Sequence, residues 1–575
     1  MALDRCPLCR RVAKALHSDT GFAVPTCYNE QGRRAIHPGS WTELQHSHSC
    51  STCSQIVLIF EAQSLEREVK PDPTKVQFWL IDAEAKYLRL RLEHQIYDPP
   101  LEFFIRPVGQ EHLKRAVTLL DPQWLDWERV ERWVKTCDSY HLKCSSRLAR
   151  PLVTQARSIG WKMMLICLPD QCLVDANGSE KYVALSHVWG CDQTPLATTK
   201  SNLEHLRGKN SFSSPCVRNR LPGAIRRAME FTRLLGVEFL WVDRLCIVQD
   251  DPVHATSQIN SMGSIYSGSH LTLCASDGQD AATSLRGIEQ CSEPRNIVQE
   301  VVDFDDGAGI TRWAKNIKYE DTPYPKRGWI FQEQVLSPRK LSFTGSGLSW
   351  ECQTVRGNER DIEDEPIGYS FGEYTIVHED TLWPCLKKWD NLLTAFLRRE
   401  LTYKSDILRA FSGIVEALGD SALGDFHYGL PEQFFDAALL WIPEDSLTRR
   451  RDETRGSQAD SFPSWSWAGW EGAVSSQIDY FGLCHERSNS FEGCCQLDRN
   501  IYPCVAWFKV NLESVEDRMP EIQVLARARS RRTYSFYHVL WIEWCGNIAE
   551  RRGLGRVDQS VWDALPQSNI TVHLG

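Results

Sequence analysis

Three short apolar runs alternate with helical patterns in the middle of the chain, and this alternation restricts the fold more than any other feature. Residues 182–186, 237–242 and 271–275 have the length and composition of buried strands. A helix that starts near Pro222 separates the first two runs, and a helical pattern over residues 259–266 precedes the third. Strands that alternate with helices are typical of a parallel sheet. We therefore predict an α/β fold in which helices flank a parallel sheet.

Polar and aromatic residues follow each of the three predicted strands. Right-handed crossovers place the carboxyl ends of consecutive parallel strands on the same edge of a sheet, and open parallel sheets bind ligands at that edge. The candidate ligand contacts are Ser186, His187, Trp189, Gly190, Asp243, Arg244, Ser276 and Asp277. Because adjacent residues of an extended segment point to opposite faces, Ser186 and His187 are poorly placed to act as a nucleophile and its base.

The charge and hydropathy of the chain restrict its partners and location. The 575 residues include 65 Lys and Arg against 75 Asp and Glu, a net charge of −10. An acidic chain lacks the positive charge that favours nonspecific nucleic-acid binding, so we expect no nucleic-acid partner. The N-terminus has no apolar signal region and no run approaches membrane-spanning length. We therefore expect no membrane association, a cytoplasmic location and reduced thiols.

Composition divides the chain into three regions. Residues 1–150 combine paired cysteines with strand patterns, such as residues 87–92, and are expected to form an α+β region. Residues 180–355 contain the predicted parallel sheet. Residues 356–575 combine helical patterns with mixed strands, so a second α+β region is expected there. The acidic stretch Glu359–Glu365 near this boundary is expected to form a surface loop.

Two CxxC pairs in the first region have the pattern of a metal site. Tetrahedral zinc sites commonly use two such pairs, whose thiolates lie on adjacent turns. We therefore predict a structural zinc site at Cys6, Cys9, Cys50 and Cys53.

A second group of metal-ligating residue types lies in a predicted helix over residues 123–144. Cys137, His141 and Cys144 have C-x3-H-x2-C spacing, which puts three side chains on one side of a helix. Two interpretations stay open. The three residues either hold a second metal ion or pack the helix through small thiols.

The aromatic run PSWSWAGW at residues 463–470 alternates large and small side chains. Alternation at period two predicts a strand with Trp465 and Trp467 on one face. We expect this face to pack in a core that holds the third region against the second.

Five segments of the central region, in their order along the chain, resemble the heterokaryon-incompatibility (HET) domain of filamentous fungi. The resemblance is carried by YVALSHVWG, the helix from Pro222, FLWVDRLCIVQDD, MGSIYSGSHLTLCASDG and RGWIFQEQVLSPRKLSFTGSGLSWEC. It implies a role in nonself recognition, in which an incompatible encounter triggers programmed cell death. It also implies self-association and an unidentified incompatibility partner protein.

More distantly, the family is similar to TIR domains, which implies a TIR-like sheet. TIR domains that cleave NAD carry a catalytic glutamate four residues after a tryptophan, in a WCxxE pattern. Trp329 and Glu333 keep this spacing, with Ile330 in the place of the cysteine. The similarity implies that NAD is a substrate and that Glu333 is the catalytic residue of an NAD glycohydrolase.

The chemistry of NAD cleavage assigns roles to the residues around Glu333. Cleavage of the nicotinamide N-glycosidic bond passes through an oxocarbenium-like state, whose positive charge a carboxylate stabilises. Asp243 is then expected to accept hydrogen bonds from a ribose, and Arg244 or Arg327 to contact phosphate. The full set of candidate binding residues is Ser186, Trp189, Gly190, Asp243, Arg244, Arg327 and Trp329, in which Trp189 or Trp329 forms an aromatic wall.

Simpler structural interpretations of the same residues stay open. Glu333 would pair locally with Arg327 or Arg339, and Asp243 would only fix the turn after its strand. Gly190 would serve a tight turn, since no phosphate-binding glycine spacing accompanies it. Under these interpretations the protein is a non-catalytic adaptor that signals by oligomerising its α/β domain.

Overall fold

The structure is a computed structural model, and its described residues cover most of the central region and parts of the two flanking regions. These residues are 6–10, 27–28, 34–47, 49–66, 77–83, 87–93, 101–107, 117–145, 161–189, 196–276, 285–289, 291–303, 308–313, 322–361, 382–419, 423–432, 435–444, 446–450, 462–475, 508–509, 522–526, 536–558, 564 and 568–569. None of the helices described there is long and apolar enough to cross a membrane.

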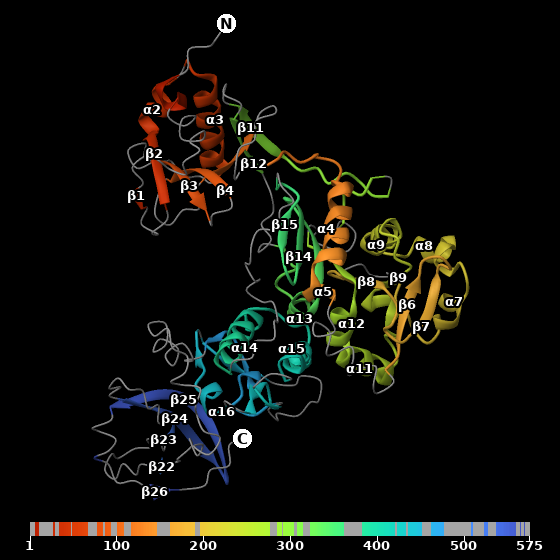
Figure 1. Ribbon diagram of the computed structural model, residues 1–575. Helices are drawn as coiled ribbons and strands as arrows, with labels where there is room; N and C mark the ends of the chain where they lie inside the picture. Colours follow the sequence, from red (N-terminus) through yellow and green to blue (C-terminus); the bar gives the residue numbers. More distant parts are fainter. Residues whose placement is uncertain are drawn as a thin grey trace.

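The middle of the chain forms an eight-stranded mixed sheet with the order β15-β14-β13-β10-β8-β9-β6-β7 (Figure 1). Its four central strands are parallel: β8 (Tyr182–Ser186), β9 (Phe239–Trp241), β10 (Leu271–Ala275) and β13 (Arg339–Thr344). The edges are antiparallel: β6 (Met163–Cys167) and β7 (Cys172–Ala176) on one side, β14 (Gly347–Cys352) and β15 (Arg356–Asn358) on the other. The predicted α/β class and the three predicted parallel strands are confirmed.

The order of the parallel strands determines where a ligand site is expected. In chain order these strands are arranged 2-1-3-4, because β9 pairs with one side of β8 while β10 and β13 follow on the other. This is the order of flavodoxin-like doubly wound sheets, which bind ligands where the winding direction reverses. Here the reversal lies between the carboxyl ends of β8 and β10.

The helices that connect these strands agree with the predicted patterns. Helix α9 (Gly223–Leu234) follows Pro222 and ends before Gly236, whose φ of +69° suits a helix stop. The pattern over residues 259–266 is divided between α11 (Pro252–Asn260) and α12 (Met262–Gly268). Right-handed crossovers put α9 on one face and α12 with α13 (Gly328–Leu336) on the other. Shorter helices are α7 (Leu203–Arg207), α8 (Pro215–Arg218) and α10 (Asp243–Cys246), with a 3-10 turn at Ser211–Ser213.

A seven-stranded antiparallel sheet lies in the first region, in the order β1-β2-β3-β4-β5-β12-β11 (Figure 1). Its strands are β1 (Cys27–Tyr28), β2 (Arg34–Ser40), β3 (Gln77–Ala83), β4 (Tyr87–Glu93), β5 (Leu101–Pro107), β11 (Gln299–Asp303) and β12 (Ala308–Trp313). The helices beside it are α2 (Trp41–His46) and α3 (Ser51–Glu66). Strands β11 and β12 come from within the central region, so the chain returns to the first region after β10.

The predicted helix over residues 123–144 is two helices, α4 (Trp127–Tyr140) and α5 (Leu142–Ser145). Asp126 caps α4, because its carboxylate accepts a hydrogen bond from the Arg129 backbone N–H. Trp133 of α4 stacks on Trp350 of β14 with the ring centroids 6.2 Å apart. Helix α4 is therefore part of the core of the central sheet.

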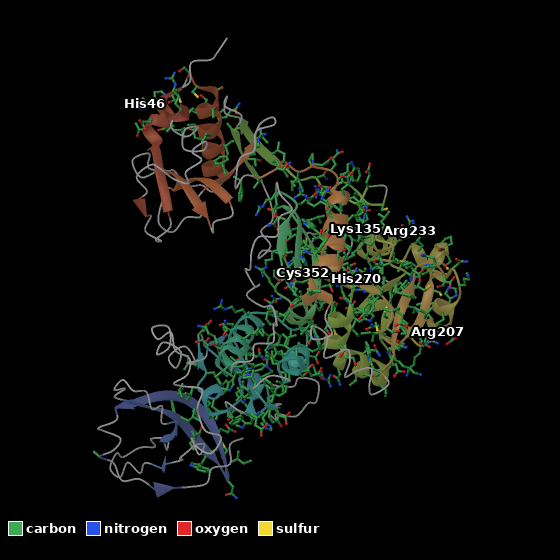
Figure 2. The ribbon with its side chains drawn as sticks, in the orientation of Figure 1. His46, Lys135, Arg207, Arg233, His270 and Cys352 are labelled. Atoms are coloured by element: carbon green, nitrogen blue, oxygen red, sulfur yellow. The ribbon has the colours of Figure 1, made fainter. Side chains whose placement is uncertain are left out.

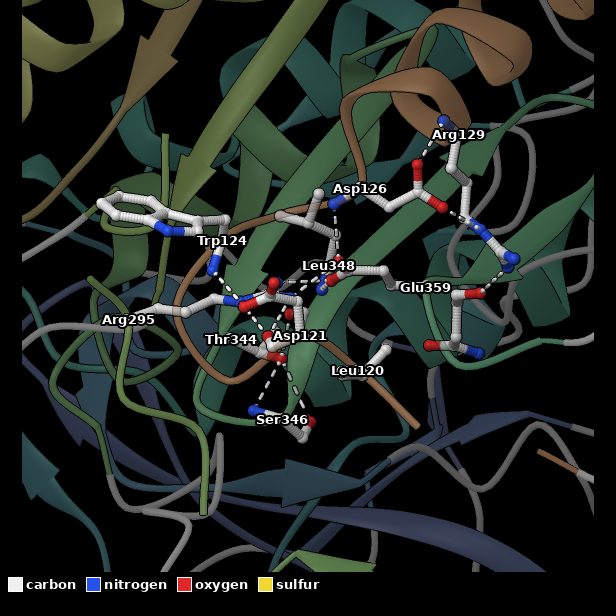
Figure 3. A network of polar contacts seen from close by, with 12 residues as sticks. Leu120, Asp121, Trp124, Asp126, Arg129, Arg295, Thr344, Ser346, Leu348 and Glu359 are labelled. Atoms are coloured by element: carbon white, nitrogen blue, oxygen red, sulfur yellow. Dashed lines mark hydrogen bonds and ion pairs between the residues drawn. The ribbon is translucent and has the colours of Figure 1, made fainter. Parts of the chain in front are cut away.

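Glu359 corrects one sequence prediction, because the start of the acidic stretch is buried and not a surface loop. Its carboxylate accepts hydrogen bonds from the backbone N–H groups of Asp126 and Leu348, each at 2.9 Å. The Arg295 guanidinium donates two more, at 2.6 and 2.9 Å (Figure 3). A buried carboxylate needs such partners, and Glu359 is only 2% exposed. Sequence charge alone did not indicate that this carboxylate is buried.

A second hydrophobic core forms around the helices α14 (Leu382–Leu397) and α15 (Arg409–Gly419). The predicted strand in PSWSWAGW is wrong, because Trp467–Gly469 form a 3-10 turn. The predicted core role of Trp467 is confirmed, since it is 1% exposed and packs edge-on against Phe396. Phe396 in turn contacts Phe331 of α13, so this core includes a helix of the central region.

Short strands and helices complete the third region. They are α16 (Phe435–Ala438), β16 (Phe426–His427), β17 (Leu430–Pro431), β18 (Ile442–Pro443), β19 (Thr448–Arg449), β20 (Trp470–Glu471) and β21 (Val474–Ser475), with a 3-10 turn at Lys404–Asp406. A five-stranded sheet near the C-terminus contains β22 (Phe508–Lys509), β23 (Ile522–Ala526), β24 (Phe536–Cys545), β25 (Ile548–Asp558) and β26 (Ser568–Asn569).

Gly413 of α15 joins the third region to the segment RGWIFQE. Its backbone N–H donates to Gln332 Oε1 at 3.1 Å, and a Cβ at this position would lie 2.8 Å from both Gln332 Oε1 and the Gly263 Cα. Gly413→Ala is expected to destabilise the protein by about 1–3 kcal/mol, because the Gly263 backbone cannot move away. Thermal unfolding should show the loss. Ser412→Ala in the same helix should change little, and an unchanged midpoint for both variants would contradict this close packing.

Candidate functional site

A buried carboxyl group, that of Glu333, lies at the switch point between β8 and β10. This side chain lies on α13 and is 6% exposed. The hydroxyl groups of Ser186, at the end of β8, and Tyr266, in α12, lie within hydrogen-bonding reach of the carboxyl group. Burial raises the pKa of Glu333 to about 7, and the charge of Asp243 acts in the same direction. A perturbed carboxyl group at a sheet edge is a candidate for chemistry.

Two tyrosines beside Glu333 were not among the predicted site residues. The Tyr324 hydroxyl lies 2.6 Å from the Ser186 Oγ, and Tyr324 is fully buried. The Tyr266 hydroxyl also donates to the Leu185 carbonyl, at 3.3 Å. Tyr266 was predicted only as part of a helix face, and nothing local distinguished it from a core residue. These hydroxyl groups make the surroundings of Glu333 polar without adding charge.

Asp243, Trp189 and Arg244 form the outer part of the site. The Trp189 Nε1–H donates to Asp243 Oδ2 at 2.6 Å, and the Arg244 guanidinium lies 4.4 Å from the Trp189 ring centroid. Arg244 Nη2 also donates to the Trp189 carbonyl at 3.1 Å. The Asp243 side chain is 24% exposed, so this part of the site is in contact with solvent. The structure therefore brings these three predicted residues together, with Arg244 itself buried at 4% exposed.

His187 is buried beside Asp243. Its Nδ1 lies 4.0 Å from Asp243 Oδ1, too far for a hydrogen bond. Burial lowers the pKa of His187 to about 4, and Arg244 and Arg327 lower it further while Asp243 opposes them. The imidazole is therefore neutral at pH 7. Ser186 bonds to Tyr324 while His187 faces Asp243, as expected for adjacent residues of a strand.

The remaining predicted residues have different positions. Arg327 precedes α13, and its Nη1 donates to the His187 carbonyl at 3.5 Å. Trp329 is half-buried and packs against both hydrophobic cores. Arg339 does not pair with Glu333, because its guanidinium bonds to Asp138 at 2.9 Å. Gly190 lies outside the described residues.

The comparison with known families agrees with the segments that build this site. Residues 182–333 match the family model described as heterokaryon incompatibility protein (HET). The chain carries a HET domain. The match begins with the first residue of β8 and ends at Glu333, so it contains every residue of the candidate site. No curated protein and no solved structure matches the chain.

Outside the HET domain, the four predicted zinc ligands of the first region lie together. Their Sγ atoms are all within 4.8 Å of one another, with Cys6 and Cys53 at 3.4 Å and Cys9 and Cys50 at 3.5 Å. Four thiolates around a tetrahedral zinc ion at about 2.3 Å lie about 3.8 Å apart, so the donor set is compatible with zinc. The nearby His46 is not part of this cluster, and its Nδ1 contacts the Thr42 carbonyl at 2.6 Å.

A second cluster contains a residue that the sequence interpretation did not include. Cys137, His141 and Cys144 lie together with Cys352 of β14, and the four ligand atoms are within 4.8 Å of one another. All four residues are buried. The three-ligand spacing was a signal that a fourth ligand was missing, but it did not say where in the chain to look. This cluster is also compatible with zinc.

Proposed function

We propose that the HET domain signals nonself recognition and cell death by hydrolysing NAD at Glu333, on a TIR-like sheet. The observation that carries the proposal is the buried Glu333 carboxyl group at the switch point of a 2-1-3-4 parallel sheet. Its spacing from Trp329 is that of the catalytic glutamate in NAD-cleaving TIR domains. The match to the HET family supports the signalling role.

The proposed reaction uses the ionised form of Glu333. Water adds to the C1′ carbon of the nicotinamide ribose, nicotinamide leaves with the electron pair of the glycosidic bond, and one proton is released. The leaving group is neutral, so no acid needs to protonate it. The Glu333 carboxylate stabilises the positive charge that develops on the ribose. Since its pKa is about 7, the rate should rise as the pH passes through 7.

The outer residues provide the binding contacts. Arg244 donates to the Trp189 carbonyl and Arg327 to the His187 carbonyl, so both guanidinium groups lie at the segment after β8, where their charge would attract the pyrophosphate. The Trp189 ring is half-buried next to Asp243, so it offers an aromatic surface for a flat base. Asp243 reaches solvent, and each of its oxygens, which accept from the Trp189 indole and the Arg244 backbone N–H, has a second lone pair for a ribose hydroxyl group.

Glu333→Gln tests the proposal. The purified variant should release nicotinamide from NAD about 100-fold more slowly or worse, because glutamine cannot carry the negative charge. Cells that express it should keep their NAD and survive. Glu351→Gln, in β14 of the same sheet, is the matched control and should retain the activity of the unchanged protein.

The alternative is a non-catalytic adaptor that signals by self-association. The specific observation in its favour is that the Glu333 side chain is only 6% exposed and has hydroxyl neighbours. Under this alternative, toxicity survives Glu333→Gln and follows the oligomeric state, measured by light scattering. Toxicity and NAD loss that both persist in Glu333→Gln would exclude the enzymatic proposal.

A further inference from the structure

The cluster of Cys137, His141, Cys144 and Cys352 brings together two distant parts of the chain. Cys137 lies in the last turn of α4, His141 is the residue after it, and Cys144 lies in α5. Cys352 is the last residue of β14, 211 positions after His141 (Figure 2). Four metal-ligating side chains from three local elements converge on one buried point.

The distances within the cluster suit a single tetrahedral ion. His141 Nδ1 lies 3.4 Å from Cys352 Sγ, and all four ligand atoms are within 4.8 Å of one another. Zinc bonds of about 2.3 Å to sulfur and about 2.0–2.1 Å to nitrogen place tetrahedral ligands about 3.6 Å apart. Three thiols and one imidazole are a frequent ligand set of structural zinc. A closed site is expected here, because none of the four residues is exposed.

A buried guanidinium group, which also pairs with a carboxylate, donates a hydrogen bond to the cluster. Three thiolates and one zinc ion sum to a net charge of −1. Arg339, only 2% exposed, donates from Nε to Cys137 Sγ at 3.1 Å, while its Nη2 bonds to Asp138. Such hydrogen bonds orient metal ligands and tune their charge. Arg339 Nη1 also donates to the His270 carbonyl at 3.3 Å, so the guanidinium group is held in place beside the Cys137 sulfur.

Backbone groups support the same assignment at Cys352. The N–H groups of Thr354 and Val355 point to Cys352 Sγ, at 3.5 and 3.4 Å. These residues form the turn between β14 and β15. Hydrogen bonds of this kind favour a charged sulfur over a neutral one.

We propose that Cys137, His141, Cys144 and Cys352 bind one structural zinc ion. The ion links α4 and α5, which precede the HET domain, to β14, which follows it. Because it closes a loop of about 200 residues, it removes many conformations of the unfolded chain. The site is independent of the proposed NAD chemistry.

The zinc content of two purified full-length proteins tests the proposal. The unchanged protein should contain two zinc ions per chain, one in each cysteine cluster. A variant with Cys6→Ser and Cys9→Ser should keep one, and this variant leaves the HET domain intact. Zinc loss to zero in that variant would overturn the proposal.

Ligand changes within the second cluster provide the complementary result. In the Cys6→Ser, Cys9→Ser background, Cys352→Ser should remove the remaining zinc, whereas Cys172→Ser, a buried cysteine in β7, should keep it. Retention of zinc by a folded Cys352→Ser protein would contradict the assignment.

His141→Cys keeps the test valid even where Cys352→Ser does not fold. With cobalt in place of zinc, this variant should still bind the ion and show a stronger sulfur-to-cobalt charge-transfer band, because four thiolates replace three. An unchanged cobalt spectrum would show that His141 is not a ligand and overturn the proposed site.

Discussion

Glu333→Gln is expected to stabilise the protein at pH 8 by about 3 kcal/mol and to change its stability little at pH 4. The folded state holds the pKa of Glu333 at about 7, against an ordinary value of 4.5. Below pH 4.5 the carboxyl group is neutral in both states and burial costs little. As the pH rises toward 7, only the unfolded state ionises, so stability falls. Above pH 7 the loss levels off at about 3 kcal/mol, and glutamine avoids it.

The measurement is the unfolding of both proteins over pH 4–8, followed by calorimetry or by hydrogen exchange in the HET domain. Glu351→Gln is again the matched control, with the opposite sign expected. The Glu351 carboxylate pairs with Lys340 at 3.0 Å and with Arg356 at 3.4 Å, so its loss should destabilise at neutral pH. A stability difference between Glu333→Gln and the unchanged protein that does not vary with pH would show that Glu333 ionises normally.

This cost in stability connects the fold to the proposed function. A carboxyl group that serves only structure is expected to have cationic partners, as Glu351 has. Glu333 instead lies among hydroxyl groups; burial raises its pKa and the charge of Asp243 adds to this, while the charge of Arg327 opposes it. Groups that reduce stability in this way are typical of functional sites. The stability test therefore examines the same property of Glu333 that the NAD assay requires, without needing a substrate.

The parallel core was predictable because its signals are local. The strands 182–186 and 271–275 have the predicted bounds, and Gly236 stops α9 where expected. Once the strands are parallel, Ser186 and Asp243 must lie at the same edge, so much of the site followed from chain order alone.

The parts that could not be predicted depend on contacts between distant residues. The Tyr324 hydroxyl bonds to Ser186 across 138 positions, and Cys352 joins His141 across 211. The sequence around Tyr324 and Cys352 contains no pattern that predicts these partners. The strand predicted in PSWSWAGW failed for a different reason. The tryptophans alternate at period two, as in a strand, but Trp467 begins a 3-10 turn. Its side chain is still buried in the core.

Glu359→Ala is expected to destabilise the protein by about 3–5 kcal/mol, the largest loss expected for a single substitution here. The change leaves the Arg295 guanidinium, whose side chain is 8% exposed, without its carboxylate. It also leaves the backbone N–H groups of Asp126 and Leu348 without an acceptor (Figure 3). Denaturant unfolding should show the loss, and hydrogen exchange should show faster exchange at these two amides.

The exposed pair of Arg552 and Glu543 is the matched control for this prediction. Its ion pair has the same 2.6 Å separation as that of Arg295 and Glu359, but its side chains are 34% and 56% exposed. Glu543→Ala should therefore cost no more than about 1 kcal/mol. Equal losses for the two variants would mean that separation and not burial determines the cost. A larger loss for Glu359→Ala would instead establish that one buried carboxylate holds α4, β14 and the segment before β11 together.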